Sequence, residues 1–353
     1  MTSSIPLSVL DLSPVAAGAS SRDALLASTE LARRADALGF ARFWVAEHHA
    51  MPAVASTSPA VLLAHLAAAT ERIRVGSGGV MLPNHPALVV AEQFAMLEAL
   101  HPGRIDLGIG RAPGADPRTA AALRRTVEGL GAEDFPLELV DVLALLGSGP
   151  EGHPPSARAA RLTATPAPTS APEAWLLGSS LFSAQLAAEL GLPFSYAHHF
   201  STGRTHQAAA AYRSTFRPSS VLAQPRLMVS ASVIVADTEE EARYLAGPSR
   251  VMALSLRSPR PLAPIVTPED AQRMLADLDP GTADLLAQLP GTQIATTPER
   301  AVAELAGLVA RTGADELLLT ATTHDVATRI ATLEAIAPLW AEADVRAGEP
   351  AAR

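Results

Sequence analysis

Three side chains that can bind or transfer protons, those of Glu47, His48 and His49, directly follow the short apolar run Phe43–Ala46. A run of this kind is typical of a buried strand. In parallel α/β sheets and barrels, ligands lie at the carboxyl ends of the strands, and imidazole groups move protons near neutral pH. The segment therefore predicts a reaction centre. Because successive strand residues point to opposite faces, only one of the two histidines has to face it.

A second pair of histidines, His198 and His199, follows another short apolar run. Four imidazoles at strand ends allow a metal site as an alternative. Barrel hydrolases that use zinc or iron usually supply carboxylates from other strand ends as well, and the one such candidate, Asp106, comes too early in its strand. We therefore expect no metal. The residues assigned to the wall of a substrate pocket are His49, Tyr196, His198, His199 and Phe200.

Two further segments predict an anion site. Arg111 follows a strand and stands between glycines, where a guanidinium is well placed to bind a phosphate, although a plain surface arginine would fit the same pattern. Ser179, Ser180 and Ser183 stand where a strand leads into a helix. The free N–H groups and the dipole of a helix N-terminus favour an anion there. Ordinary capping needs one serine, so three predict phosphate binding.

Glycines interrupt the apolar segment Val75–Pro83 at positions 76, 78 and 79. Glycine weakens a strand, and in a strand it usually marks a bulge or the close approach of a ligand or a neighbouring backbone. A simple turn is the alternative, but the apolar residues on both sides argue against it. Gly78 and Gly79 therefore predict a bulge beside a ligand.

Short β-branched runs alternate with longer helical patterns along most of the chain. Eight such strand–helix units predict an α/β fold, a (β/α)8 TIM barrel, because a doubly wound sheet usually has fewer strands. A stretch rich in proline at about residues 248–291 predicts an insertion near the seventh β/α unit of a single domain that spans residues 1–353. The expected strands are residues 5–12, 43–46, 73–82, 104–109, 174–177, 193–196, 226–236 and 317–320.

The composition excludes several classes of protein. Charged residues make up only 18% of the chain and the net charge is −9, which argues against a nucleic-acid surface or a polybasic membrane patch. Cysteine and lysine are absent, so thiolate chemistry, Schiff-base chemistry and the lysine of a phosphate-binding loop are excluded. The first residues lack a signal-peptide pattern and no apolar run is long enough to span a bilayer, so we expect a cytoplasmic protein.

In combination these segments resemble the bacterial-luciferase-like flavin-dependent monooxygenases. The motifs occur in order over most of residues 5–250, which makes the resemblance more specific than any one of them. The matching residues are Ala46–His49, Val75–Pro86, Ala91–Phe94, Pro102–Arg111 and Gly178–Pro193.

The resemblance implies a barrel, usually dimeric, that binds FMN at the carboxyl ends of its strands. It assigns the FMN phosphate to Arg111, Ser179, Ser180 and Ser183, and it places a non-prolyl cis peptide at Gly78–Gly79, behind the ring system. His48 would be the catalytic histidine. Reduced FMN would come from a separate NAD(P)H-dependent flavin reductase. One atom of O2 would enter an organic substrate by hydroxylation, epoxidation or Baeyer–Villiger insertion.

Luciferases themselves often carry an acidic residue at the position of Ser179 and a reactive cysteine at the position of Gly110, so light emission from an aldehyde is not expected here. Three alternatives remain open. They are an oxidoreductase that uses the deazaflavin F420 without oxygen, a metal-dependent barrel hydrolase, and a non-catalytic flavin-binding subunit of a heterodimer. The presence of both His48 and Arg111 argues against the last.

Overall fold

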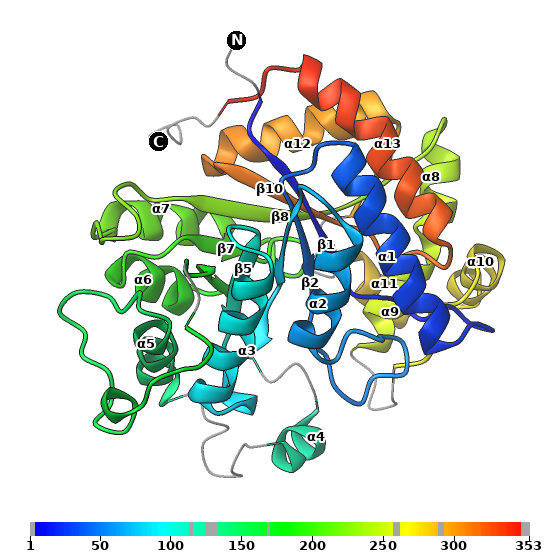
Figure 1. The fold of residues 1–353 in the computed structure, drawn as a ribbon. Coiled ribbons are helices and arrows are strands. Elements are labelled where there is room, and N and C mark those ends of the chain that lie inside the picture. The colour runs from blue at the N-terminus through cyan, green and yellow to red at the C-terminus, as the bar shows by residue number, and fades with distance from the viewer. Residues whose placement is uncertain are drawn as a thin grey trace.

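Eight parallel strands close into a barrel in the computed structural model, which describes residues 4–112, 116–123, 133–167, 170–256, 262–288 and 293–346 (Figure 1). Strand β10 pairs with both β8 and β1 and so closes the ring. The predicted (β/α)8 TIM barrel is confirmed. Its strands are β1 (Leu7–Asp11), β2 (Arg42–Val45), β3 (Arg74–Ser77), β5 (Ile105–Gly110), β6 (Glu173–Gly178), β7 (Phe194–Tyr196), β8 (Leu227–Val235) and β10 (Glu316–Thr320).

Helices cover the outside of the barrel and bury their apolar faces against it (Figure 1). Local sequence sets their ends. Ser20 and Asp23 form a capping box at the start of α1 (Ser21–Ala37), and Gly39 with a φ of +81° follows its end. The others that follow barrel strands are α2 (Pro59–Ala69), α3 (Ala87–Leu100), α4 (Pro117–Ala122), α5 (Phe135–Leu145), α6 (Leu181–Glu189), α7 (Thr205–Thr215), α8 (Glu239–Leu245), α12 (Pro298–Thr312) and α13 (Val326–Glu342).

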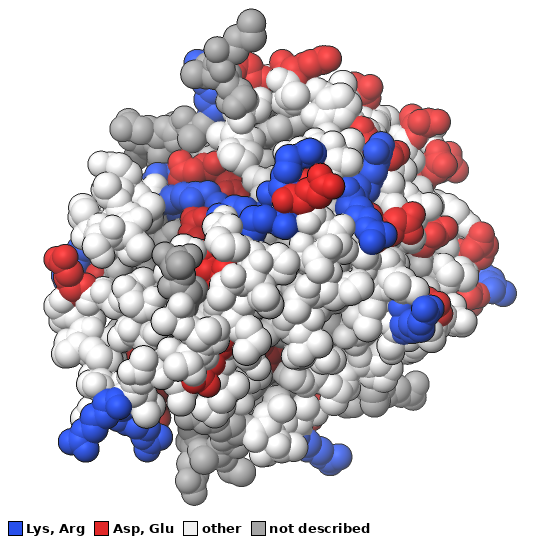
Figure 2. All heavy atoms as spheres, in the orientation of Figure 1, with Lys and Arg blue, Asp and Glu red and all other residues white. Residues whose placement is uncertain are grey.

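Charge is distributed unevenly over the face seen in Figure 2. Arginines and carboxylates gather over α8, α12 and α13, whereas few of them lie over α2 and α3. Among the described residues, no helix combines the length and the apolar character needed to cross a bilayer.

A bulge interrupts the third strand, as its glycines predict. Strand β4 (Val80–Met81) resumes the pairing with β5 after β3 has ended. Gly76 pairs with Asp106 and Val80 pairs with Ile109. Between these two pairs the chain advances four residues from β3 to β4 but only three along β5, so the bulge accommodates one extra residue. The Gly78–Gly79 peptide is cis, as the resemblance implies. A Cβ atom on Gly79 would lie 2.7 Å from the carbonyl oxygen of Gly108, so the two backbones can approach this closely only where glycine stands.

The segment between α8 and the next strand, where an insertion is predicted, forms the helices α9 (Gly247–Ser255), α10 (Pro268–Ala276) and α11 (Pro280–Ala287). Residues 257–261 and 289–292 of the predicted range lie outside the described residues. Ile265 exchanges backbone hydrogen bonds of 2.8 Å with Val15 and Ala17 in the loop after β1. The insertion is thereby attached to the carboxyl end of the barrel. The strand that follows, β9 (Gln293–Thr296), extends the sheet along the far end of β8 and was not predicted.

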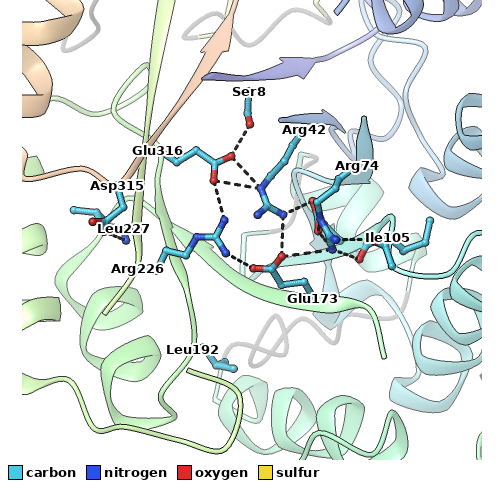
Figure 3. Close-up of polar contacts among 12 residues, drawn as sticks. Ser8, Arg42, Arg74, Ile105, Glu173, Leu192, Arg226, Leu227, Asp315 and Glu316 are labelled. Atoms are coloured by element: carbon cyan, nitrogen blue, oxygen red, sulfur yellow. Dashed lines mark hydrogen bonds and ion pairs between the residues drawn. The ribbon is translucent and has the colours of Figure 1, made fainter. Parts of the chain in front are cut away.

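The opposite, amino-terminal end of the barrel is filled by ion pairs (Figure 3). Arg42 lies at their centre, 2.8 Å from Asp106, 3.1 Å from Glu173 and 3.0 Å from Glu316. Burial alone would lower the pKa of Arg42, but these three carboxylates outweigh it and hold the pKa above its ordinary value. We call the group the ion-pair plug. Its members are Arg42, Arg74, Arg226, Asp106, Glu173 and Glu316.

The plug borders an aromatic layer inside the barrel. The guanidinium groups of Arg42 and Arg226 lie 5.0 and 4.8 Å from the ring centre of Trp175, and the indole N–H of Trp44 donates to Asp106 at 2.9 Å. Trp44 and Trp175 pack edge to face and form one buried cluster with side chains of β1, β8 and β10. Asp106 is therefore part of the structural end of the barrel, as its early position in the strand predicts.

Candidate active site

Glu47, which follows β2, is the hydrogen-bonding centre of the carboxyl end of the barrel. Its carboxylate is fully buried. One oxygen lies 2.8 Å from Nε2 of His49, 2.8 Å from Nε2 of His85 and 3.1 Å from the amide nitrogen of Asn84. The other oxygen accepts the backbone N–H of Met81 at 3.1 Å. The end of β2 and the segment after the glycine bulge are therefore joined through this one side chain.

This arrangement sets the hydrogen-bonding roles of three groups. Burial alone would raise the pKa of Glu47, but the hydrogen bonds and charge of His85, together with hydrogen bonds from His49 and Asn84, outweigh burial and hold the pKa below its ordinary value. An ionised carboxylate can only accept hydrogen bonds, so both imidazoles must donate their Nε2 protons to it. Glu47 thus sets the tautomer and the orientation of His49 and His85.

Replacing Glu47 with Gln should lower kcat by about 10–100-fold, the size of effect found for carboxylates that orient histidines at metal sites. Glutamine has nearly the same shape but presents an NH2 group to partners that are themselves donors. The Glu47→Gln substitution should also lower the free energy of unfolding by about 1–3 kcal/mol, because buried donors lose their acceptor. Steady-state kinetics and urea unfolding measure both effects. The control is Glu92→Gln, since the contacts of Glu92 to Thr165 are exposed and 3.3 Å long; equal behaviour of the two variants would contradict the assignment.

His48 and His199 lie close enough for their side chains to interact electrostatically. His199 follows β7, and its Nδ1 lies 2.6 Å from the hydroxyl of Ser230 on β8, which donates to the backbone carbonyl of Tyr196 at 3.2 Å. Burial lowers the pKa of His199 to about 4, and electrostatic repulsion with the neighbouring imidazoles of His198 and His48 contributes to this. His199 is therefore neutral at neutral pH. With Nδ1 donating to Ser230, its other nitrogen is left as an acceptor.

The remaining pocket residues do not all point the same way. His198 is buried, and its Nδ1 lies 2.6 Å from the hydroxyl of Thr205 at the start of α7, whereas Nδ1 of His199 lies 2.6 Å from the hydroxyl of Ser230 on β8. The ring of Tyr196 is buried in the main core, and its hydroxyl donates to the backbone carbonyl of Ser179 at 3.2 Å. Phe200 is 62% exposed. The structure thus separates His198 from His199 and makes Tyr196 a support for the serine turn.

The predicted anion-binding residues lie around the N-terminus of α6. Ser180 caps the helix, accepting from the backbone N–H of Ser183 at 3.4 Å, and the two hydroxyls lie 3.2 Å apart. The first turn of α6 carries no acidic residue. The guanidinium of Arg111 lies 4.4 Å from the ring centre of Phe182, so β5 delivers its arginine to this same turn. Free N–H groups, hydroxyls and a guanidinium are the donors that a phosphate requires.

The structure also identifies residues that the sequence did not single out for the site. His85 and Asn84 reach Glu47 from nearly 40 positions further along the chain, and Phe182 supports Arg111. The segment Leu82–Pro86 is part of the family resemblance, but nothing in its spacing assigned it a partner. Together, Glu47, His49 and His85 also form a group of the described residues whose ligand atoms all lie within 4.8 Å of one another, close enough to hold a metal ion.

Comparison with known proteins agrees with this architecture. The family of luciferase-like monooxygenases matches residues 5–338. The chain is 47% identical to a luciferase-like monooxygenase of Escherichia coli K12 over 244 residues, covering 68% of this chain and 70% of that protein. It is 44% identical to the protein YvbT of Bacillus subtilis over 336 residues, 95% and 96% of the two chains. It is 38% identical to the N-acetyl-S-alkylcysteine monooxygenase of Bacillus subtilis over 67% of this chain and 70% of that one.

Solved structures show the same fold. The crystal structure of apo-MsnO8 is 35% identical and superposes with a TM-score of 0.85 over 95% of this chain and 98% of that one. The oxygenating constituent of 3,6-diketocamphane monooxygenase in complex with FMN gives 0.71 at 20% identity, covering 98% and 100% of the two chains. An F420-dependent secondary alcohol dehydrogenase gives 0.67 at 17% identity, covering 96% and 99%. A barrel with this site and these relatives identifies the chain as a member of the luciferase-like monooxygenase family.

Proposed function

We propose that the protein is a two-component monooxygenase that uses reduced FMN from a separate NAD(P)H-dependent reductase to insert one atom of O2 into a small organic substrate. The observation that carries this proposal is the meeting of two features at the carboxyl end of one barrel. The Arg111 and Ser179–Ser183 turn provides donors for a phosphate, and the glycine bulge lies between that turn and the histidines after β2.

The residues present fit FMN. Arg111, Ser179, Ser180 and Ser183 would hold its phosphate, and the backbone at Gly78–Gly79, which presents no side chain, would lie behind its ring system. When bound, the flavin would supply electrons to activate O2, which is chemistry that no side chain of this protein can supply. His48 would move a proton at the reacting atoms, while neutral His199 would accept a hydrogen bond from the substrate. Glu47 would hold His49 and His85 in place as donors.

The proposal is tested by two measurements on the whole protein. Anaerobic titration should show tighter binding of reduced FMN than of reduced F420. Turnover with a flavin reductase under 18O2 should then place one labelled oxygen atom in the product. N-acetyl-S-alkylcysteines belong in the substrate panel because the name of a 38% identical relative states that substrate class. Tighter binding of reduced F420, with turnover that continues without oxygen, would overturn the proposal.

Replacing Arg111 with Gln should weaken FMN binding by about 10–100-fold, because hydrogen bonds to charged groups contribute about 1.5–3 kcal/mol and each 1.4 kcal/mol is a factor of ten. Riboflavin, which lacks the phosphate, should bind both forms of the protein equally. The control is Arg346→Gln, since Arg346 is exposed and pairs with the exposed Asp344. Fluorescence titration with the two flavins gives the comparison. A variant that loses affinity for riboflavin as well would show that Arg111 does not bind the phosphate.

A metal-dependent hydrolase is the second candidate, favoured by the Glu47, His49 and His85 group. Two imidazoles and one carboxylate are a known ligand set for iron and zinc. The four hydrogen bonds already made by the Glu47 carboxylate explain its burial without a metal, which makes this the weaker candidate. Elemental analysis of the purified protein, and activity after dialysis against a chelator, distinguish the two functions.

We also propose a homodimer built on α2 and α3. Apolar side chains on these helices are exposed, namely Val61, Val89, Met96 and Leu100, and few charges surround them (Figure 2). Exposed apolar surface of this kind marks protein interfaces. Light scattering should give the mass of a dimer, and Met96→Arg should give the mass of a monomer.

A further inference from the structure

A cavity of about 410 Å³ lies on the outer side of the barrel, between α12 and the outer face of β8. This volume is within the usual range for sites that bind small molecules, about 300–1,000 Å³. Its walls include His198, Ala231, Ile294, Gly307, Leu308 and Arg311. We call it the α12 groove.

Small side chains create the α12 groove. The residues of α12 that line it recur at positions 300, 303, 304, 307, 308 and 311, which is one face of the helix. Gly307 stands in the middle of that face and carries no side chain, and Ala231 is the β8 residue opposite. Glycine inside a helix lowers the stability of the helix. At position 307 this cost is accompanied by open space in the groove, where any other residue would place a side chain. The floor of the groove is therefore apolar.

The charged groups that line the groove are two arginines, Arg300 and Arg311, and one carboxylate, Glu304. Arg311 has no carboxylate within ion-pair distance in the described ranges of the chain, whereas Arg300, at the other end of the groove, is paired with Glu239. His198 is buried and uses Nδ1 to bind Thr205; the described residues provide no hydrogen bond to its Nε2. Burial lowers the pKa of His198 to about 4, and the positive charge of Arg311 contributes to this. His198 is therefore neutral at neutral pH.

The groove and the candidate active site lie on opposite sides of the same two segments. In β8, Ser230 bonds to His199 and the next residue, Ala231, lines the groove. After β7, His199 faces the active site and His198 faces the groove. Alternation along β8 explains why Ser230 and Ala231 point to opposite faces. His198 and His199 lie in the turn after β7, and their rings are held apart by their separate contacts to Thr205 and Ser230. The groove is thus a separate site, although its walls are continuous with those of the active site.

We propose that the α12 groove binds a small organic carboxylate, with the carboxylate group on Arg311 and an apolar body over Ala231, Ile294 and Leu308. A guanidinium fits a carboxylate in a two-point contact. The positive charge of Arg311 matches one negative charge, and the carboxylate of Glu304, which also lines the groove, disfavours a second, as in phosphate. This proposal does not depend on the flavin chemistry of the active site.

The probes are benzoate and benzamide, which have nearly the same shape but differ in charge. Calorimetric titration of the whole protein should show binding of benzoate and at least about tenfold weaker binding of benzamide, the size expected when one charged hydrogen bond is lost. Arg311→Gln should weaken benzoate binding by about the same factor. Gly307→Leu should abolish it, because leucine fills the groove. Leucine favours a helix more than glycine does, so this variant should fold. A Cβ at position 307 would lie 3.1 Å from the guanidinium of Arg311, whose flexible end can move aside.

Arg22→Gln is the matched control, since Arg22 is an exposed arginine on α1. Saturating benzoate should also shift the imidazole NMR signals of His198, which are assigned with a His198→Gln variant. Equal affinity for benzoate and benzamide, or no binding of either, would overturn the proposal. So would benzoate binding that survives Gly307→Leu unchanged, because the ligand would then lie elsewhere, for example in the active site.

Discussion

Replacing His48 with Ala should lower product formation by about 10²–10⁴-fold, the usual contribution of a general acid or base, while the affinity for FMN changes little. His48 follows β2 and is close enough to His199 to affect its pKa, whereas the donors for the phosphate come from β5 and the N-terminus of α6. The backbone N–H of His48, which donates to the carbonyl of Ser56 at 3.1 Å, is kept in the variant. The local fold should therefore survive.

Two measurements separate a proton-transfer role from a structural one. Added imidazole should restore part of the activity of His48→Ala if the side chain moves a proton, and it should do nothing if the side chain only fills space. His206→Ala provides the control, because His206 is exposed on α7. Full turnover in His48→Ala would assign the proton transfer to another group. His199 could not supply that proton at neutral pH, since its pKa is held at about 4.

The barrel could be predicted from sequence because each of its elements is encoded locally. Val233–Val235 in β8 and Leu317–Leu319 in β10 are apolar runs within short β-rich segments, and residues such as Ser20 and Gly39 set helix ends. The glycine bulge could be predicted for the same reason, since glycine inside a strand usually marks a bulge or a close approach of two backbones. The short strand β9 was missed because Gln293–Thr296 contains only two apolar residues and follows a stretch rich in proline, so no strand pattern stands out.

Contacts between distant segments could not be predicted in the same way. One partner of Glu47 is His49, two positions further on, and the others lie at positions 81–85, which the bulge after β3 brings within reach. His198 and His199 lie in the turn after β7, so strand alternation does not set their directions, which depend on the positions of Thr205 and Ser230 in the folded chain. The ion-pair plug did have a readable signal, because charged residues stand at the starts of several otherwise buried strands, for example Arg42, Glu173 and Glu316.

Replacing Arg42 in the ion-pair plug with Ala should lower the free energy of unfolding by about 3–5 kcal/mol, the cost of removing one partner from a buried ion pair. Asp106 and Glu316 are almost fully buried, and the variant leaves both with fewer compensating charges. Trp175 also loses one of its two guanidinium neighbours. The plug lies at the end of the barrel opposite the candidate active site, so FMN affinity should not change in the folded variant.

Arg34→Ala is the matched control for this prediction. Arg34 pairs with Glu334 at 2.5 Å, a shorter distance than any that Arg42 makes, but both side chains of that pair are more than 40% exposed. An exposed pair contributes only about 0–1 kcal/mol, because water solvates its separated charges. Urea unfolding of the two variants therefore tests whether the contribution of an ion pair to stability depends on its burial rather than on the distance between its atoms. Should Arg42→Ala fail to fold, Arg42→Lys keeps the charge without the two-point contacts, and it should still lose more stability than Arg34→Ala. Equal losses in the Arg42 and Arg34 variants would show that the plug does not stabilise the barrel through its buried charges.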